Sequence, residues 1–453
     1  MTLDRARTEL DRPIEGMADL VSYFRGAEKP ASQWRVGVEN EKLSLGASLK
    51  PVPYGGEEGV AAVLRGLAER SGWSPVSEGG DLIALEGEGA SITLEPGGQL
   101  ELSGAPLLTA HETAREFRAH LALVKEVSEP LGIHWLALGA QPLHDVSELP
   151  RMPKERYRIM REFLPPRGSL ALDMMHATAS VQASFDYADE PDMIAKLRTA
   201  LGITPIVAAL YANSSLSAGK GTGFISRRMH IWRNTDPERC GALPFVFDPD
   251  FGYARYAAWA LDVPMFFIVR DGRYHPLRNT TFREFMAHGH GELRATLADF
   301  DRHLTTLFPD VRLKRLIEVR AVDAVSADLV CSAPALWKGL LYAAQARDAA
   351  FALVRAWSPE GREQAFDAVS RRGLKASVLG RPVRELAAEI VAIAGEGLRR
   401  IDHRDDAGRD ERILLEPLAG VLEQGKSPGE SVLDRWEGEW NRSPERLIAH
   451  TRY

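Results

Sequence analysis

The chain has 453 residues, of which 45% are hydrophobic and 26% charged, a balance typical of globular proteins with a large core. Its formal net charge is -7, and acidic and basic residues are mixed along its length. Because no basic stripe is present, nucleic acid is not expected as a partner. Two cysteines, Cys240 and Cys331, are too few for a disulfide framework and fit a reducing compartment.

The sequence gives no sign of a membrane span or of secretion. No run approaches the ~18 consecutive apolar residues of a membrane-spanning helix. The N-terminal segment, MTLDRARTELDRPIEGM, is charged and lacks the apolar stretch of a secretory signal. We therefore expect a cytoplasmic protein with no membrane partner.

Apolar spacing and turn residues predict the elements along the chain. In WRVGVENEKL (34–43), the β-branched Val36 and Val38 favour a strand. In ASITLEPGGQLELSG (90–104), two alternating runs flank a Pro-Gly-Gly turn and predict a hairpin. In chain order, we expect a helix at 14–28, the strand at 34–43, a helix at 56–71, the hairpin at 90–104, a helix at 107–131, strands within 133–142 and 170–187, a helix at 191–214, a strand within 315–325, and helices at 334–356, 383–402 and 429–440.

This order of elements favours an α+β fold with a mostly antiparallel sheet, because strands joined by tight turns are set apart from the helices. The expected strands lie before residue 325, and the last third of the chain is mainly helical. No long linker separates the two parts. We therefore expect one compact domain over residues 1–453, with a mainly helical C-terminal part from about residue 330.

Glutamates recur on three of the expected strands. Strand periodicity places Glu39 and Glu41 on one face, and Glu95 and Glu101 flank the hairpin turn. A third strand carries Glu318, with Arg320 on the same face. A single glutamate on a strand is more often solvated on an outer face. However, carboxylates buried together require hard cations such as Mg²⁺, so the repeated pattern makes a metal site an equally strong reading.

Common nucleotide-binding and metal-binding motifs are absent from the sequence. SAGKGTGF (217–224) has glycine and lysine at the wrong spacing for a phosphate-binding loop, and neither GxGxxG after a strand nor HExxH occurs. A nucleotide would therefore bind through metal ions and side chains.

Several long motifs together identify a family resemblance. They include GVENEK, ITLEPGGQLELSGAPL, MPKERYRIMR, GFISRRMHIWRNTDPERCGALPFVFD and HLTTLFPDVRLKRLIEVRAVD. In this order, the chain resembles the plant and proteobacterial type of glutamate–cysteine ligase from about residue 13 to near its end. The resemblance implies a curved antiparallel sheet related to the catalytic fold of glutamine synthetase.

The resemblance also implies the reaction. ATP phosphorylates the γ-carboxylate of glutamate, and the amine of cysteine then displaces phosphate, which is the first step of glutathione synthesis. The implied partners are glutamate, cysteine and ATP, with about two or three Mg²⁺ ions as cofactors. The implied assembly is a monomer or a weak homodimer.

Residue roles follow from the same resemblance. Arg320 would face the ATP phosphates and act with Glu41 in catalysis, and Arg156 and Arg228 would bind amino-acid substrates, since a guanidinium pairs bidentately with a carboxylate. Trp232 and Tyr256 would form walls of that pocket, although core packing explains such aromatic residues equally well. The implied metal ligands are Glu39, Glu41, Glu95, Glu101, Gln182 and Glu318.

Two departures from the family pattern affect function. After its two methionines, DMMHATASVQ replaces a stretch that usually reads Leu-Arg-Thr-Cys-Thr, so His176 is new beside the substrate site. His176 could be a base, but a structural histidine is the stronger reading. The change leaves open a ligase with another amine acceptor. A binding protein without activity is a third hypothesis, which the complete set of carboxylates opposes.

The other departure concerns the redox-sensitive disulfides of plant members. Cys331 matches one plant cysteine, but its partner position falls near Ala114, and the second pair falls at Leu277 and in a shortened AHGHGEL segment. We therefore predict no thiol switch of the plant kind and treat both cysteines as small buried residues.

Overall fold

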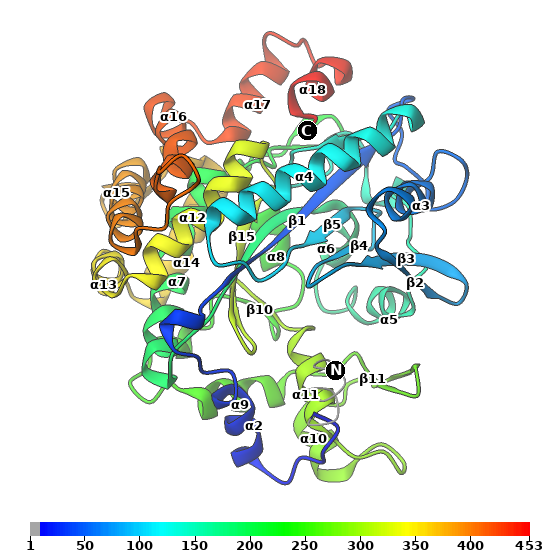
Figure 1. Ribbon diagram of the computed structural model, residues 1–453, viewed down its shortest axis with the longest axis vertical. Coiled ribbons are helices and arrows are strands. Elements are labelled where there is room, and N and C mark those ends of the chain that lie inside the picture. The colour runs from blue at the N-terminus through cyan, green and yellow to red at the C-terminus, as the bar shows by residue number, and fades with distance from the viewer. Residues whose placement is uncertain (1–9) are drawn as a thin grey trace.

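A nine-stranded antiparallel sheet lies at the centre of the structure, a computed structural model that describes residues 10–453 (Figure 1). Its strands are β1 (Val36–Leu45), β2 (Ser74–Glu78), β3 (Asp81–Glu86), β4 (Ser91–Leu94), β5 (Leu100–Ser103), β6 (His134–Leu136), β7 (Ser180–Phe185), β14 (Val311–Leu313) and β15 (Ile317–Asp323). They are ordered β14-β15-β7-β1-β5-β4-β3-β2, and β6 pairs with the end of β1. The predicted α+β class with an antiparallel sheet is confirmed. Part of the N-terminal segment searched for a secretory signal lies outside the described residues.

The two faces of β1 have different surroundings, as its sequence period of two requires. Val36, Val38 and Asn40 are buried on the face covered by the helices. Glu39 and Glu41 point to the opposite face, where they line a cavity. The prediction that these two glutamates share one face is confirmed.

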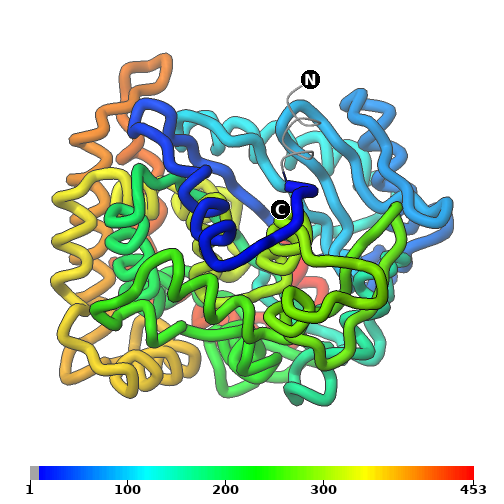
Figure 2. Tube along the Cα trace, turned by 90° about the horizontal axis from the view of Figure 1, so that it is seen from below, coloured from blue at the N-terminus to red at the C-terminus, as the bar shows by residue number. Residues whose placement is uncertain are grey.

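Helices pack around the sheet and make up most of the C-terminal part of the chain. They are α2 (Met17–Arg25), α3 (Val60–Ser71), α4 (Ala110–Ser128), α5 (Glu155–Phe163), α6 (Ala171–Ala177), α7 (Glu190–Tyr211), α8 (Arg227–Arg233), α9 (Tyr253–Asp262), α10 (Phe282–His288), α11 (Leu297–Leu304), α12 (Ala327–Tyr342), α13 (Ala344–Ala352), α14 (Pro359–Arg372), α15 (Val383–Ile401), α16 (Glu416–Gln424), α17 (Pro428–Glu437) and α18 (Pro444–Thr451). Helices α4, α7 and α12 cover one face of the sheet. Near the N-terminus, α2 packs against α9 and α11 from the middle of the chain (Figure 2).

Short two-stranded pairs complete the fold. They are β8 (Leu216–Ser217) with β9 (Lys220–Gly221), β10 (Cys240–Gly241) with β13 (Phe308–Pro309), β11 (Phe267–Arg270) with β12 (Arg273–Pro276), and β16 (Ser377–Val378) with β17 (Arg381–Pro382). The β10–β13 pair is parallel. It brings Phe308 to the cavity that Glu39 and Glu41 face.

Helix α7 is the longest helix in the described part of the chain and one of its most buried elements. By length and composition it could cross a membrane, but 83% of its most apolar window is buried within the protein. A helix that is apolar on all sides is expected where other elements surround it. Here α12, α13, α14, α15 and β15 pack against it, so α7 is a core helix of the fold.

The predicted hairpin at 90–104 is present as β4 and β5. Its turn lies against α6: a β-carbon on Gly97 would come within 2.2 Å of the His176 carbonyl oxygen. Gln99 holds the turn from within, because its amide oxygen accepts from the Gly97 N–H and its amide nitrogen donates to the carbonyl of Thr178. The turn that carries Glu95 is therefore fixed in place.

Two predicted elements differ from the structure. The strand expected within 170–187 is helix α6 followed by β7, because a short apolar run fits a buried helix as well as a strand. The helix expected at 334–356 begins earlier, after Ser326, and is broken at Ala343, whose backbone is extended. Both cysteines are free, with Cys331 buried and Cys240 half-buried, which confirms that they form no disulfide with each other.

Candidate active site

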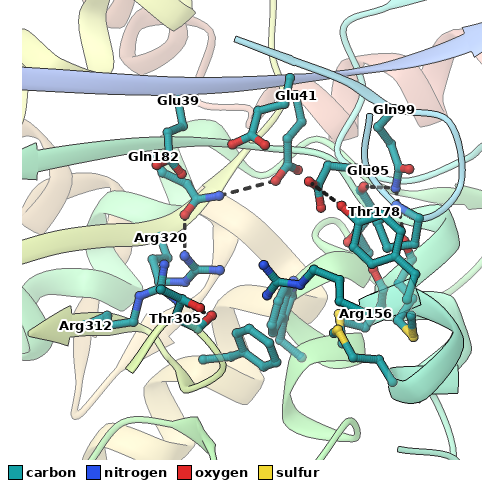
Figure 3. Close-up of a pocket in the computed structure, with 18 residues that line it drawn as sticks. Glu39, Glu41, Glu95, Gln99, Arg156, Thr178, Gln182, Thr305, Arg312 and Arg320 are labelled. Atoms are coloured by element: carbon teal, nitrogen blue, oxygen red, sulfur yellow. Dashed lines mark hydrogen bonds between the residues drawn. The ribbon is translucent and has the colours of Figure 1, made fainter. Parts of the chain in front are cut away.

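A cavity of about 200 Å³ lies between the outer face of the sheet, α5, α6, α8 and β13. Figure 3 shows the carboxylates of Glu39, Glu41 and Glu95 on one side and the guanidinium groups of Arg156 and Arg320 on the other. One wall is therefore acidic and the opposite wall basic. Of the residues predicted from the sequence, those that line it are Glu39, Glu41, Glu95, Glu101, Arg156, Gln182, Trp232 and Arg320.

The acidic wall follows from the register of the sheet. Glu41 lies directly opposite Glu101 on β5, and Glu39 lies opposite Gln182 on β7. Like charges directly opposite each other on neighbouring strands destabilise a sheet. A sheet that keeps them there must obtain a compensating interaction from another group.

Glu41 is the best-supported carboxylate in the cavity. One oxygen accepts from the Ser180 backbone N–H at 2.7 Å and from its hydroxyl at 3.1 Å, and the other accepts from the Gln182 amide nitrogen at 3.3 Å. These donors fix the carboxylate in orientation but supply no positive charge. Burial and the nearby Glu95 raise the pKa of Glu41 to about 7.

The neighbouring carboxylates show the same electrostatic strain. Burial, followed by the charge of Glu318, raises the pKa of Glu39. Burial, followed by the charges of Glu95, Glu39 and Glu41, raises the pKa of Glu101 well above its usual range. Glu95 sits at the edge of the cluster, where its carboxylate is 3.0 Å from the Tyr157 hydroxyl. A cation bound among these groups would relieve the strain.

Two arginines make the basic wall. Arg320 donates to the amide oxygen of Gln182 and lies 3.3 Å from Glu318. Arg156 has no carboxylate within ion-pair distance among residues 10–453, and its buried Nε has no hydrogen-bond partner there. An unpaired guanidinium aimed into a cavity suits an anionic group of a ligand.

Glu318 is buried beside the cavity and does not line it. It is 0% exposed and receives two hydrogen bonds from Arg312, at 2.6 and 3.0 Å. Arg312, Lys314 and Arg320 hold the pKa of Glu318 well below its usual range. In this arrangement Glu318 orients Arg320 of the basic wall and the neighbouring Arg312, and its role as a metal ligand stays a prediction.

Arg228 lies one layer behind the cavity. Its side chain faces Asp323 at 3.8 Å, and its Nη2 donates to the Arg320 carbonyl at 2.9 Å. It supports the floor of the site, and its predicted contact with a substrate stays untested. Trp232, which does line the cavity, has the Arg228 and Arg320 guanidinium carbons 5.6 and 5.7 Å from its ring centre.

The structure corrects the prediction for Tyr256. This residue is 0% exposed on α9 and packs against Phe24 and Trp259, away from the cavity. Its hydroxyl oxygen accepts from the Leu313 N–H at 3.0 Å. Tyr256 is therefore a residue of the protein core, which was the alternative prediction for this aromatic side chain.

Replacement of Tyr256 by phenylalanine tests this correction. The change leaves the buried N–H of Leu313 without a partner, so we expect a loss of about 1–3 kcal/mol in unfolding free energy. Substrate KM values should stay within about twofold of the parent, because no cavity contact is lost. Urea unfolding and steady-state kinetics measure the two effects, and a large rise in KM with unchanged stability would restore Tyr256 to the substrate site.

His176 does not line the cavity. It is 5% exposed, and its Nδ1 lies 3.2 Å from the Pro150 carbonyl oxygen. Burial, followed by the nearby Arg161, lowers the pKa of His176 to about 4. Such an imidazole is a weak base at neutral pH, so the structural reading of His176 is favoured.

Sequence reasoning missed about half of the cavity lining. These residues lie within the motifs quoted above, but all except Arg312 are uncharged, and spatial proximity is what identifies them as lining residues. They are Pro96, Gln99, Tyr157, Met160, Met174, Met175, Thr178, Thr305, Phe308 and Arg312. Of these, Arg312 had a usable signal, because it lies on the strand antiparallel to Glu318.

No group of three or more His, Cys, Asp or Glu side chains within residues 10–453 is gathered tightly enough to hold a metal ion. The donor set nevertheless fits a hard cation, because it consists of carboxylate and amide oxygens and several carboxylates have raised pKa values.

The facing acidic and basic walls make this cavity the candidate active site, and known proteins share the fold that carries it. The fold resembles the glutamate–cysteine ligase of Francisella tularensis, solved with AMP, at a TM-score of 0.53 and 11% identity, covering 92% of this chain and 87% of that one. Residues 35–450 match the family described as glutamate-cysteine ligase family 2, and the chain belongs to that family.

Curated relatives agree with this assignment. The chloroplastic glutamate–cysteine ligase B of Oryza sativa is 42% identical over 96% of this chain and 87% of its own length. The chloroplastic enzyme of Medicago truncatula is 41% identical over 96% of this chain and 85% of its own length. The family resemblance and the predicted class of enzyme, an ATP-dependent ligase, are confirmed. The expected cytoplasmic location is wrong by the same comparison, because these relatives are chloroplastic enzymes.

Proposed function

We propose that this chain joins the γ-carboxylate of glutamate to the amine of cysteine with hydrolysis of ATP to ADP and phosphate, and that the cavity between the acidic and basic walls is its active site. The observation that carries the proposal is the pairing of these walls. Glu39, Glu41 and Glu95 face Arg156 and Arg320 across one space. ATP with its metal ions requires both kinds of wall, since carboxylates hold the ions and guanidinium groups hold phosphate.

The reaction needs no covalent nucleophile from the protein. The γ-carboxylate of glutamate attacks the γ-phosphorus of ATP, and ADP leaves with the electrons of the broken P–O bond. The amine of cysteine then attacks the acyl phosphate, loses a proton and expels phosphate. Both cysteines of the chain lie outside the cavity, and burial raises the pKa of Cys240 to about 12, which agrees with a mechanism that needs no protein thiolate.

Side chains of the two walls have separate tasks. Arg320 is placed to offset charge on the transferring phosphoryl group, and its orientation depends on Glu318 and Gln182. Arg156 is free to bind the α-carboxylate of an amino acid. Met160, Met174 and their aromatic neighbours form an apolar part of the cavity lining, which would limit the access of water to an acyl phosphate.

Magnesium is part of the proposal. Glu39, Glu41, Glu95, Glu101 and Gln182 would hold about two or three Mg²⁺ ions, with Glu318 as a further candidate ligand. The ions, when bound, neutralise phosphate charge and orient the nucleotide. We also propose a monomer or a weak homodimer as the working assembly, which sedimentation at assay concentrations measures.

A phosphate-release assay across amino acids tests the function. With glutamate, ATP and Mg²⁺ present, cysteine should give the highest kcat/KM of the amines tried. Faster turnover with another amine would favour a related γ-glutamyl ligase instead. Absence of phosphate release with every amine, together with no nucleotide-dependent thermal shift, would leave a binding protein.

A further inference from the structure

The carboxylate of Asp323 is enclosed at the end of β15. The residue is 1% exposed. One oxygen accepts from the Asn213 N–H at 2.8 Å and from the Ser214 hydroxyl at 2.7 Å. The other accepts from the Ser226 hydroxyl at 3.1 Å and lies 3.8 Å from the guanidinium of Arg228. A buried carboxylate with four such neighbours is a fixed point of the fold.

The two hydroxyl groups connect Asp323 to the start of α8. Ser226 precedes the helix, and its oxygen accepts from the Met229 N–H at 3.2 Å. The oxygen of Ser214 accepts from the Arg228 N–H at 3.0 Å. Each hydroxyl therefore donates to Asp323 while it accepts from α8. Because a carboxylate can only accept, Asp323 sets the direction of both hydroxyl groups.

The backbone around Asp323 is shaped to fit this carboxylate. A β-carbon at Gly139 would come within 2.5 Å of the Asp323 carboxyl carbon. Only glycine leaves that space, and the same segment is held by the hydrogen bond from the Gly139 N–H to the Asn213 carbonyl at 2.9 Å. The backbone at Gly139 therefore packs against one side of the Asp323 carboxylate, and the hydroxyl groups that contact α8 bind its other side.

Helix α8 carries two groups that bear on the cavity. Arg228 donates to the Arg320 carbonyl at 2.9 Å, and Trp232 lines the cavity with the Arg228 and Arg320 guanidinium carbons 5.6 and 5.7 Å from its ring centre. Since β15 carries both Arg320 and Asp323, the contacts of Asp323 fix α8 relative to the strand that bears the phosphate-facing arginine. A shift of α8 would displace Arg228 and Trp232 together.

We propose that Asp323 is a positioning residue for substrate binding: it holds the first turn of α8 so that Trp232 lines the cavity and Arg228, one layer behind, supports the strand that carries Arg320. The inference rests on the proposed function for its choice of substrates. Asp323 touches no substrate, and it acts through Arg228.

Asp323→Asn tests this role with little change in size. The amide nitrogen would face donors that need an acceptor, and the negative charge beside Arg228 would be lost. We expect KM for at least one amino-acid substrate to rise about tenfold or more, with KM for ATP within about twofold. Isothermal titration with glutamate and cysteine measures the loss of affinity without turnover. A variant that binds these amino acids more weakly can therefore be told apart from a protein that lacks ligase activity altogether.

A double-mutant cycle separates positioning from a general loss of stability. In an Arg228→Lys background, Asp323→Asn should raise the amino-acid KM by less than about a further twofold, because both changes act on the same side chain. The matched control is Asp173→Asn, which removes the negative charge that pairs at 2.7 Å with Arg227, the first residue of α8, and should leave KM unchanged. If Asp323→Asn does not fold, Ser226→Ala should raise the same KM about threefold.

Several results would overturn the proposal. These are an unchanged amino-acid KM and affinity in a folded Asp323→Asn variant, equal effects in both Arg228 backgrounds, or the same loss in Asp173→Asn. A uniform fall in kcat with every KM unchanged would also overturn it, since a positioning role through Arg228 acts on binding.

Discussion

Replacement of Glu41 by glutamine is expected to lower kcat/KM on the order of a thousandfold while the protein stays folded. Glu41 lies at the centre of the acidic wall, opposite Glu101 and within reach of Gln182. Glutamine keeps the size of the side chain and can still accept from the Ser180 N–H. The negative charge, one metal-binding oxygen and the hydrogen bond from the Gln182 amide nitrogen are lost.

The Mg²⁺ dependence distinguishes this loss from a change in substrate binding. If Glu41 holds a metal ion, the variant should need more Mg²⁺ for half-maximal rate, and KM for the amino acids should change much less than kcat. Initial rates across a Mg²⁺ series at fixed glutamate, cysteine and ATP give the measurement.

The control for this experiment is Glu86→Gln at the exposed end of β3, which makes the same change in net charge away from the cavity. That variant should retain parent activity and parent Mg²⁺ dependence. Near-normal turnover in Glu41→Gln at low Mg²⁺ would remove Glu41 from the metal site and with it the central argument for the acidic wall.

The sequence was most informative where a period of two could be checked on a strand. Glu39 and Glu41 lie on the predicted face because β1 is regular from end to end. The hairpin was equally readable, because Pro-Gly-Gly marks a turn between alternating runs. These local rules placed most of the acidic wall without any knowledge of the rest of the fold.

Tertiary packing decided what the local rules could not. Tyr256 carries the same aromatic signal as Trp232, yet α9 turns Tyr256 into the core and α8 turns Trp232 to the cavity. Glu318 has the strand period of a cavity residue, but Arg312 on the adjacent strand pairs with it. The ion-pair partner of a buried charge depends on the order of the strands in the sheet, and this order cannot be predicted from any single segment of the sequence.

The acidic wall should also make the metal-free protein less stable as pH rises. Burial and Glu95 raise the pKa of Glu41 from 4.5 to about 7, so the folded protein holds this proton to higher pH than the unfolded chain. Between about pH 4.5 and 7 the folded state therefore binds more protons, and the free energy of unfolding falls as pH increases. For this group alone the full fall is about 3 kcal/mol.

Glu41→Gln imitates the protonated carboxyl group, so the variant should avoid this loss. In metal-free buffer we expect it to be more stable than the parent at pH 8, by up to about 3 kcal/mol, and nearly equal to the parent at pH 5. Buried histidines with lowered pKa values, such as His303 at about 3, act equally on both proteins and cancel in the difference.

Urea unfolding of both proteins at the two pH values, with a chelator present, measures this difference. Glu86→Gln is again the matched control, because it removes one exposed negative charge and should give no gain at pH 8. Addition of Mg²⁺ should shrink the advantage of Glu41→Gln, since an ion that binds the parent carboxylates stabilises the parent by mass action. A variant that is less stable than the parent at pH 8 without metal would mean that Glu41 is already neutralised within the protein, and the acidic wall would then need no cation.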